Sequence, residues 1–470
     1  MKKSLGLLVL LCAIAAACSS SDTPATAPEP ATDPGTTQAP VTEPPTTTAP
    51  EPGTTTTTTS PEPEPGTTTT TTSPEPEPGT TTTQPPTTTT TPPDPVDDRV
   101  PADPDAPVAE WVAGVNAAGW SFHSHLTGNA VSSPMSIGMA FSLSRAGASG
   151  DSGASLDEIF GFPEADTHSA ANAVDLRLAE ASVEPTTLEV ANQLFPDDGF
   201  SPLPDFLATA ARQYGAAIEP VDTADGAAAA DTINRWASER TRGLIPMIVD
   251  AGTVQDQKLV LVNTVYLKAD WARQFFAELT EDGQFNTGDN RWVTVPFMRD
   301  QSPRERRYVL LDEADAVELP YAGGELAMWL IVPHDAAGLP AVEEALDAAA
   351  LSGLSRAART GTVQLAMPKW EQTLPPADLF EWLCPQGFCP GAPFGGIAPD
   401  IFISAALHGA KVIVDEKGTE AAAATAVAFP TSLLPEPDLT IVADRPFLWA
   451  IVHQDTGALL FVGRLVDPAE

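Results

Sequence analysis

The sequence has few of the residues that build common catalytic or cofactor sites. Its 470 residues include four cysteines and six histidines, and they contain no HExxH, CxxC or glycine-rich phosphate loop. These absences argue against a metal centre, a nucleotide-binding enzyme and any resident cofactor. Basic residues are also scarce, with 24 Lys and Arg against 63 Asp and Glu and a net charge of −39. That balance excludes nucleic acid and heparin-like polyanions as partners, because both bind to clusters of basic residues.

A long segment near the N-terminus lacks basic and aromatic residues altogether. No Lys or Arg occurs between Lys3 and Arg99, and residues 18–104 consist largely of Thr, Pro and Glu. A 13-residue unit repeats there, in which a glycine opens a threonine run and Pro-Glu-Pro closes it. Such a composition cannot bury enough apolar area to offset the entropy cost of ordering. We therefore predict a disordered stalk that proline stiffens, about 250 Å long at full extension.

Residues 1–17 have the pattern of a secretory signal. Two lysines precede a short apolar run, and small residues lead up to Cys18. A cysteine at the cleavage point is typical of bacterial lipoprotein signals, in which it becomes the lipid-bearing first residue. The alternative is an ordinary signal peptidase site and a secreted protein, with Cys18 incidental. We expect a lipid on Cys18 to hold the protein at the extracellular side of the bacterial cell membrane, with no other membrane contact.

The remaining residues, 105–470, have the composition of one large globular domain. Apolar residues recur at helical spacing over 108–115, and residues 233–241 also indicate a helix. Ser133 followed by Pro134 is typical of a capped helix start. Apolar runs rich in β-branched residues predict strands over residues 258–267, 326–332, 439–442, 447–453 and 457–466. Helices dominate the first half and strands the second, which predicts the α+β class.

Two cysteines, Cys384 and Cys389, lie in this domain. Two thiols alone are too few for a structural zinc site. In an exported protein we expect a disulfide between them. Because the loop that it closes is short, it contributes only modestly to stability.

Residues 414–427 are the most informative segment of the chain. Between residues 418 and 426, every residue except Glu420 is Gly, Ala or Thr. Glu and Ala favour a helix, but the alternation of a strand explains more. Glu420 then lies on one face, and the opposite face carries the small side chains of Thr419, Ala421, Ala423 and Thr425. Such a strand fits between two others without steric clash, so the segment is suited to insertion into a sheet.

This segment resembles the hinge of the serpins, which reads E-E/K-G-T-E-A-A-A-A-T. The match runs from Glu416 to Thr425 and includes Gly418. Five more stretches resemble serpin motifs and follow the family's order: Asn129 to Ser136, Asn263 to Trp271, Val295 to Met298, Leu407 to Ala410, and residues 443–464. The resemblance covers residues 105–468.

The resemblance implies a serpin fold with three β-sheets, eight or nine helices and an exposed reactive-centre loop. It also implies a polar cluster beneath the opening sheet, the shutter, formed by Ser133, Ser136, Asn263 and His408. Trp271 aligns with the breach, where loop insertion begins. Each of these residues also has a purely structural interpretation, since buried histidines are hydrogen-bonded and tryptophans pack in cores.

The sequence G-D-S-G at residues 150–153 invites an enzymatic interpretation, because trypsin-like proteases carry it around their nucleophile. Here Ala154 follows, and no histidine lies upstream in a catalytic context. We therefore interpret the stretch as a small-residue turn between the second and third helices, and we expect no enzymatic activity.

The resemblance implies inhibition of serine-type endopeptidases by a suicide-substrate mechanism, in which the cleaved loop inserts into the sheet. The alternative is a non-inhibitory serpin-fold carrier or binding protein. Such a protein would tolerate bulky, charged or proline residues in the hinge, and this hinge has only the outward Glu420.

The scissile bond follows from the family's usual interval, counted from Glu416. It lies between Ser432 and Leu433, or next to Leu434 if the longer loop shifts the count. No Lys or Arg occurs between Lys417 and Arg445, which excludes trypsin-like targets. Elastase-, chymotrypsin- or subtilisin-like serine proteases remain, with cysteine proteases as a second class, and we expect a monomer.

Overall fold

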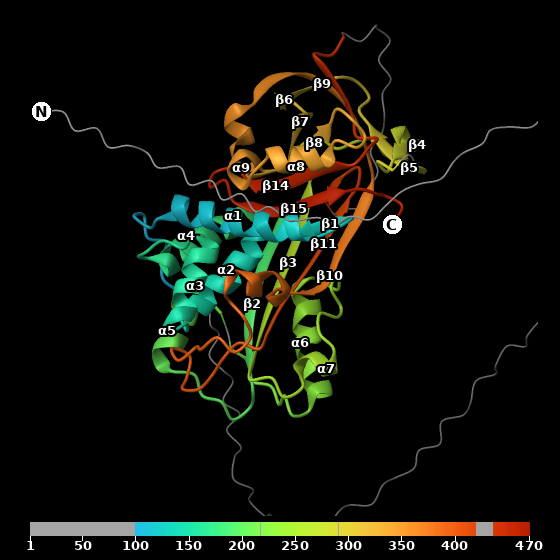
Figure 1. Ribbon diagram of the computed structural model, residues 1–470. Helices are drawn as coiled ribbons and strands as arrows, with labels where there is room; N and C mark the ends of the chain where they lie inside the picture. Colours follow the sequence, from blue (N-terminus) through green and yellow to red (C-terminus); the bar gives the residue numbers. More distant parts are fainter. Residues whose placement is uncertain (1–98, 217, 290, 420–435) are drawn as a thin grey trace, which may run out of the picture. The chain divides into compact units, whose positions relative to one another are not determined.

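The computed structural model describes residues 99–470 except 217, 290 and 420–435 (Figure 1). The described residues contain ten α-helices and two short 3-10 helices, and eight of the α-helices are seven residues or longer. The α-helices are α1 (Val108–His125), α2 (Pro134–Arg145), α3 (Asp151–Phe160), α4 (Thr167–Ala181), α5 (Pro204–Tyr214), α6 (Gly226–Arg240), α7 (Ala251–Val254), α8 (Leu339–Ala345), α9 (Ala348–Ala357) and α10 (Phe380–Leu383). The 3-10 helices are η2 (Ala277–Leu279) and η3 (Cys384–Gln386).

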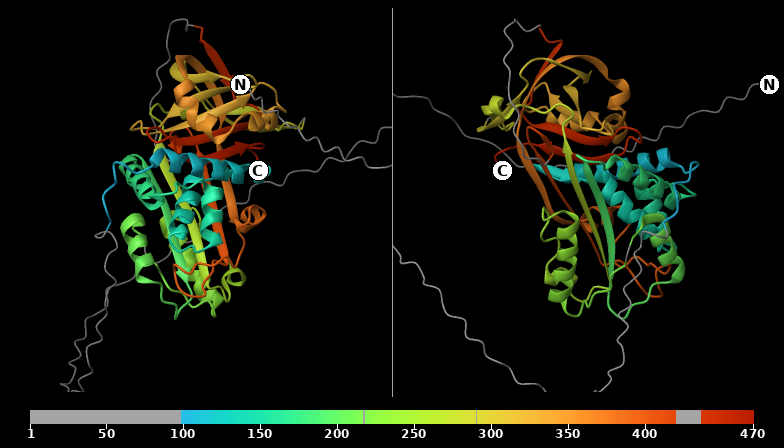
Figure 2. Two further views of the ribbon diagram at one scale, coloured as in Figure 1. Left: turned by 60° about the vertical axis from the view of Figure 1, so that its left-hand side comes forward. Right: turned by 180° about the vertical axis from the view of Figure 1, so that it is seen from behind.

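A five-stranded sheet forms the centre of the domain. Its strand order is β10 (Trp370–Asp378), β11 (Ala405–Val414), β12 (Gly418–Thr419), β3 (Leu259–Asp270) and β2 (Thr187–Pro196). Helices α6 and α7 cover one face and α2 to α5 lie on the other, as the view from behind shows (Figure 2). Strand β3 alternates accordingly, because Val260 and Val262 pack with α6 while Leu259 and Leu261 join the main core.

The second sheet has ten strands. Its order is β1 (Ala130–Ser132), β15 (Leu459–Leu465), β14 (Phe447–His453), β8 (Leu326–Pro333), β7 (Ala314–Pro320), β6 (Arg304–Leu310), β9 (Arg359–Pro368), β5 (Trp292–Arg299) and β4 (Glu281–Asn286), with β13 (Leu439–Val442) paired to β9. The resemblance implied three sheets. The third is continuous with the second here, because β9 pairs with β6 near its start and with β5 near its end.

Local sequence signals account for several of these elements. The Ser133 hydroxyl accepts a hydrogen bond from the Ser136 amide at 3.1 Å, and Pro134 occupies the first helical position of α2. Every residue of β8, β14 and β15 is buried, which explains why these strands are continuous apolar runs without alternation.

The described residues also contain the disulfide expected between the two cysteines of the domain. Cys384 and Cys389 are joined by a disulfide, and Phe388 between them is fully buried in the main core. No helix among the described residues has the length and apolar character needed to cross a bilayer. Across the described ranges there is also no group of three or more potential metal ligands.

Candidate functional site

The hinge begins as a two-residue strand inside the five-stranded sheet. In β12, Thr419 pairs with Val414 of β11 on one side and with Ala269 of β3 on the other. The turn before it is held by Asp415, whose Oδ1 accepts hydrogen bonds from the amides of Lys417 at 2.9 Å and Gly418 at 3.3 Å. The first hinge residues are therefore already in place between the two strands.

Gly418 allows this close approach. A Cβ atom at this position would lie 2.0 Å from the Ala269 carbonyl oxygen and 2.7 Å from the Asp270 Cα. Both atoms belong to the backbone of β3 and cannot rotate away. The glycine is required by packing, in addition to any flexibility that the hinge needs.

Thr419 points into the protein, as the alternation of the hinge predicts. Its exposed fraction is 1 %, and its hydroxyl is 2.9 Å from the Tyr321 hydroxyl. The Tyr321 ring stacks on Trp271 with a centroid distance of 4.5 Å and an interplanar angle of 16°. Burial raises the pKa of Tyr321, so the phenol stays neutral and available for this hydrogen bond.

Trp271, which directly follows β3, hydrogen-bonds to the residues just before β12. Its Nε1 donates to the Asp415 carbonyl at 2.9 Å, and its backbone amide donates to the Lys417 carbonyl at 2.6 Å. The amide of Phe275 donates to the Glu416 carbonyl at 2.7 Å. The residue predicted for the breach thus contacts the hinge through both its side chain and its backbone.

The carboxylate of Glu416, which lies just before β12, is held by two neighbouring side chains. Its oxygens accept from Lys369 Nζ at 2.8 Å and from the Thr280 hydroxyl at 2.7 Å. Burial alone would raise the pKa of Glu416, but Lys369 and Thr280 outweigh it, so the pKa lies below its ordinary value. Sequence reasoning missed Tyr321, Lys369 and Thr280, because nothing in their local sequence marks them as partners of the hinge.

The shutter residues lie further along the same pair of strands. His408 of β11 pairs with Asn263 of β3, and His408 Nε2 accepts a hydrogen bond from the Ser133 amide at 3.2 Å. The Ser136 hydroxyl donates to the Thr264 carbonyl at 3.2 Å. The structure therefore brings Ser133, Ser136 and His408 together with the backbone of Asn263, whose side chain lies outside the described part.

His408 is fully buried, and this lowers its pKa to about 3. At neutral pH its imidazole is uncharged, with Nε2 as acceptor and the proton on Nδ1. The Phe122 ring packs against it edge-on, with a centroid distance of 6.2 Å. We call the line along which β3 and β11 pair the seam. The side chains next to the seam at this point are thus polar and neutral.

A family model described as Serpin (serine protease inhibitor) matches residues 121–468. The chain belongs to the serpin family. It is 35% identical over 358 residues to the leukocyte elastase inhibitor of Bos taurus, across 73% of this chain and 93% of the relative. The description of the family names inhibitors of serine proteases and not enzymes.

Solved serpin structures share the fold. Manduca sexta serpin-12 superimposes with a TM-score of 0.69 at 20% identity, across 77% of this chain and 99% of its own. Human thyroxine-binding globulin, solved as a complex with thyroxine, superimposes with a TM-score of 0.67 at 26% identity, across 77% of this chain and 100% of its own. The same fold therefore binds thyroxine in one relative.

Several predicted site residues lie outside the described part of this serpin. They are Cys18, the hinge residues Ala421, Ala423 and Thr425, and the scissile-bond residues Ser432, Leu433 and Leu434. The signal segment 1–17 and nearly all of the stalk also lie outside it.

The G-D-S-G stretch has a structural place in the serpin. Gly150 adopts a positive φ of 58° as the N-cap of α3, and Asp151 opens that helix. Ser152 is 4 % exposed, and its hydroxyl has no hydrogen-bond partner among the described residues. The turn predicted for residues 150–153 is therefore confined to Gly150, because Asp151, Ser152 and Gly153 form the first turn of α3.

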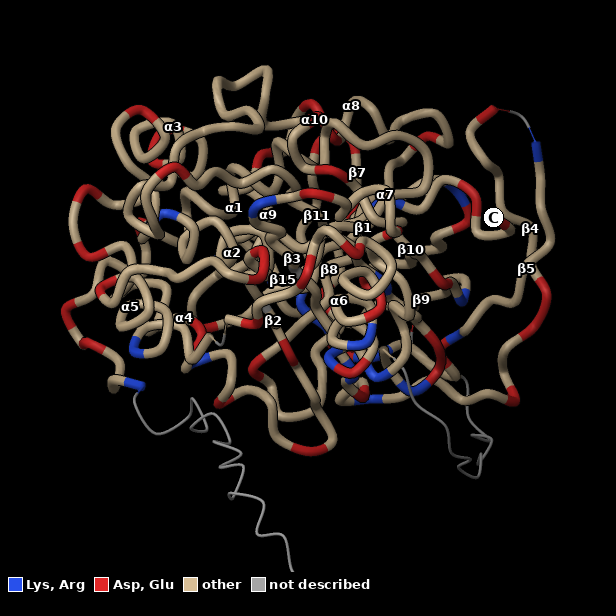
Figure 3. Tube along the Cα trace, turned by 90° about the horizontal axis from the view of Figure 1, so that it is seen from below, with Lys and Arg blue, Asp and Glu red and all other residues tan. Residues whose placement is uncertain are grey.

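Acidic residues dominate the surface of the domain. Figure 3 shows Asp and Glu on every side of the view, with fewer Lys and Arg between them. Several of the basic residues are engaged in ion pairs, among them Arg306 with Asp300 and Arg464 with Glu343.

Proposed function

We propose that this serpin inhibits serine proteases by inserting its cleaved reactive loop into the five-stranded sheet. The observation that carries the proposal is β12, in which the first hinge residues already lie between β3 and β11. Loop insertion is a known transition of serpins, in which the added strand pairs with both neighbours. The small residues that follow Thr419 in the sequence suit the same path.

The register of β12 defines where each inserted residue would lie. Thr419 pairs with Ala269, and counting six residues further along antiparallel strands brings Thr425 opposite Asn263. The same count from Val414 brings Thr425 opposite His408. Asn263 and His408 now pair with each other. On insertion, Thr425 would lie between them and add its hydroxyl to the shutter.

The same count limits how far insertion proceeds. Phe429 would lie opposite Leu259, the first residue of β3, and Pro430 follows it. A proline cannot donate to the ladder, and it is excluded from central strands. Insertion would therefore end at Phe429, a few residues before the proposed bond between Ser432 and Leu433, with Leu434 as the alternative.

The proposed targets are elastase-, chymotrypsin- or subtilisin-like serine proteases, with cysteine proteases as a second class. The reactive loop offers no basic residue to a trypsin-like pocket. The similarity to a leukocyte elastase inhibitor supports an elastase-like target.

The test is covalent trapping. The purified domain is incubated with pancreatic elastase, chymotrypsin, subtilisin and trypsin, and SDS gels are examined for a stable complex. We expect a complex with at least one of the first three and none with trypsin. Mass spectrometry of the released C-terminal fragment identifies the bond: a fragment that begins at Leu433 supports the count, and one that begins at Leu434 or Pro435 supports the shifted loop.

The second candidate is a non-inhibitory carrier, and the similarity to thyroxine-binding globulin favours it. It predicts cleavage of the loop by the whole panel without any stable complex. It also predicts little change in melting temperature after cleavage, whereas insertion predicts a large rise.

We further propose a lipid-anchored monomer at the extracellular side of the cell membrane, held there by Cys18 and the Thr/Pro/Glu-rich stalk. Cys18→Ala should release the protein or leave it unprocessed, and globomycin should block processing. Unmodified wild-type protein in the culture medium would contradict the anchor and favour ordinary secretion. Light scattering of the purified domain tests the monomer.

A further inference from the structure

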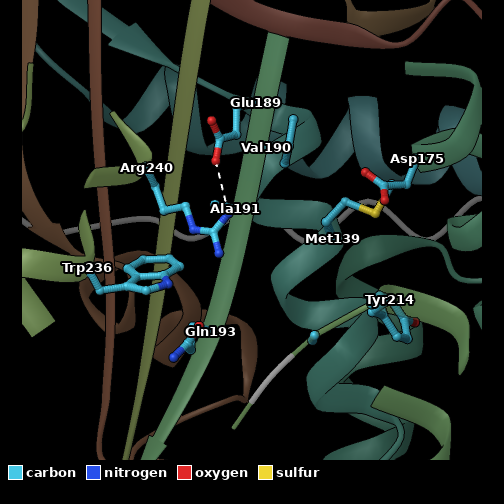
Figure 4. A pocket seen from close by; sticks show the side chains of 11 residues that line it. Met139, Asp175, Glu189, Val190, Ala191, Gln193, Tyr214, Trp236 and Arg240 are labelled. Carbon is cyan, nitrogen blue, oxygen red and sulfur yellow. Dashed lines mark hydrogen bonds and ion pairs between the residues drawn. The ribbon is translucent and has the colours of Figure 1, made fainter. Parts of the chain in front are cut away.

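A cavity of about 150 Å³ lies beside β2, and its charged side chains are paired. Arg240 of α6 binds Glu189 of β2 at 3.1 Å, as Figure 4 shows. The Asp175 carboxylate is held by Arg99 at 2.6 Å. Away from the hinge and the shutter, reactive chemistry is found instead at the disulfide.

The disulfide between Cys384 and Cys389 is open to solvent. Cys389 is exposed, and so are residues 385–387 of the loop that the bond closes. A dithiol in solution can therefore reach a sulfur atom of the bond while the domain stays folded.

Phe388, inside the same loop, is fully buried. Its ring stacks on Phe380 at 6.0 Å and meets Phe141 of α2 edge-on at 6.0 Å. The turn before it uses Gly387 with a φ of 94°, a residue that has many conformations open to it when the loop is not closed. The disulfide thus restricts a loop that places one ring in the main core.

The backbone connects this loop to the shutter. Ala377, near the end of β10, pairs with His408 of β11. The Leu379 amide then donates to the Ala406 carbonyl of β11 at 2.8 Å. Helix α10 follows, and Cys384 comes directly after it. Motion of the loop is therefore passed to the strand that carries the shutter histidine.

Ring contacts give a second connection between α10 and the shutter. Trp382 of α10 packs edge-on against Phe122 of α1 at 5.5 Å, and its Nε1 donates to the Ser121 hydroxyl at 3.2 Å. Phe122 in turn packs edge-on against His408 at 6.2 Å. The position of α10 thus bears on the packing around His408.

We propose that this disulfide is a redox-sensitive clasp on the shutter, which a small dithiol opens. A thiolate of the dithiol attacks the exposed Cys389 sulfur, a mixed disulfide forms, and Cys384 leaves as a thiolate. The second thiol of the reagent then closes the reagent's own disulfide and releases Cys389. The two cysteines gain two electrons and two protons, and the dithiol is oxidised.

Opening the bond removes a constraint on α10 and on the segment that leads into β11. In the chain-entropy model, a disulfide that closes so short a loop changes an opening equilibrium roughly 30-fold. The seam between β3 and β11 should then open more often. Faster insertion of a cleaved loop would follow, and this last consequence alone rests on the proposed function.

Hydrogen exchange tests the clasp on the chain from Ser19 to Glu470, in which Cys384 and Cys389 are the only cysteines. Exchange is measured by mass spectrometry before and after treatment with dithiothreitol, and alkylation counts the thiols formed. We expect the folded protein to be reduced, with residues 379–389 exchanging roughly 30-fold faster. Residues 405–410 of β11 should exchange about threefold faster or more, while residues 447–453 of β14 keep their rate.

The double variant Cys384→Ser, Cys389→Ser is the matched control. It should exchange like the reduced wild type and should not respond to dithiothreitol. Reduction of the wild type keeps the test decisive even if the double variant fails to fold.

Two results would each overturn the proposal. Faster exchange confined to residues 379–394 would show that the bond acts only locally. Resistance of the folded wild type to dithiothreitol would show that the bond is closed to the reagent. The assay contains no protease, so a failure of the proposed inhibition would leave its outcome unchanged.

Discussion

The two ends of the seam between β3 and β11 are built differently. At the hinge end, β12 separates the strands, and Thr419 pairs with both of them. At the shutter end, β3 and β11 pair directly over five residue pairs, from Val260 with Ala405 to Thr264 with Gly409. The sheet is thus already opened by two residues, and further opening must break the parallel ladder below.

The two ends of the seam also differ in the charge of their side chains. The hinge end combines an ion pair between Glu416 and Lys369 with the aromatic stack of Trp271 on Tyr321. The shutter end is neutral, because burial keeps His408 uncharged. Side-chain substitutions should therefore act most strongly at the hinge end. A fall in pH from 7.5 to 5.0 should act at the shutter end, because the Glu416 carboxylate is protonated only at lower pH.

The largest expected effect comes from Thr419→Arg. The guanidinium would replace a side chain that is 1 % exposed, and an unpaired charge is strongly disfavoured there. We expect the variant to keep its fold, lose β12 from the sheet and become a substrate, with no stable complex on SDS gels. Thr440→Arg, at an exposed position of β13, should keep full trapping. Trapping by Thr419→Arg at the wild-type level would rule out insertion at this seam.

Gly418→Ala tests how tightly the hinge packs against β3, and unlike Thr419→Arg it introduces no charge. The new methyl would meet the β3 backbone at 2.0 Å, so we expect a loss of about 3 kcal/mol, the upper part of the range for overpacking. Urea unfolding measures this loss. Gly353→Ala is the control, because a Cβ at this position in α9 meets nothing within 4 Å, and it should stabilise the domain slightly. If Gly418→Ala destabilises the domain by no more than about 0.5 kcal/mol, Gly418 is not packed tightly against the β3 backbone.

His408 should make the shutter end sensitive to acid. Burial lowers its pKa from 6.5 to about 3, so below pH 6.5 the unfolded state binds a proton that the folded state does not. Its stabilising contribution is complete above pH 6.5 and is lost as pH falls toward 3. Between pH 7.5 and 5.0 the loss from this residue is about 2 kcal/mol.

The measurement for His408 is urea unfolding at both pH values. His408→Gln should lose about 2 kcal/mol less than the wild type over this interval. The exposed His125 provides the control, and His125→Gln should follow the wild type. Equal losses in His408→Gln and the wild type would show that this histidine is not the source of the acid sensitivity.

The smallest expected effect is that of Tyr321→Phe. This change keeps the stack on Trp271 and removes only the hydroxyl that meets Thr419. We expect a loss of about 1 kcal/mol in the free energy of unfolding. A double-mutant cycle with Thr419→Val isolates the hydrogen bond, and additive losses would mean that the two hydroxyls do not interact.

Local sequence patterns predicted many of the elements but not all of their limits. The helix predicted over residues 233–241 begins earlier, at Gly226, where the Asp225 side chain caps the Ala228 amide. The alanines at its start carry no periodic large apolar residue, so the pattern misses them. The strand predicted over 258–267 extends to Asp270, because Gly418 pairs with that residue.

The sequence by itself predicted that the hinge begins at Gly418 and Thr419, the two residues of β12, because small residues with strand alternation are a local property of the chain. It also determined the cap of α2 and the all-buried strands, since these depend on neighbours along the chain or on composition. Tertiary structure alone decided what holds the hinge. Tyr321 is 98 residues from Thr419 in sequence, and Lys369 meets Glu416 only because β10, which follows Lys369, pairs with β11, which precedes Glu416. Such contacts depend on how separate elements pack, and no local period encodes that packing.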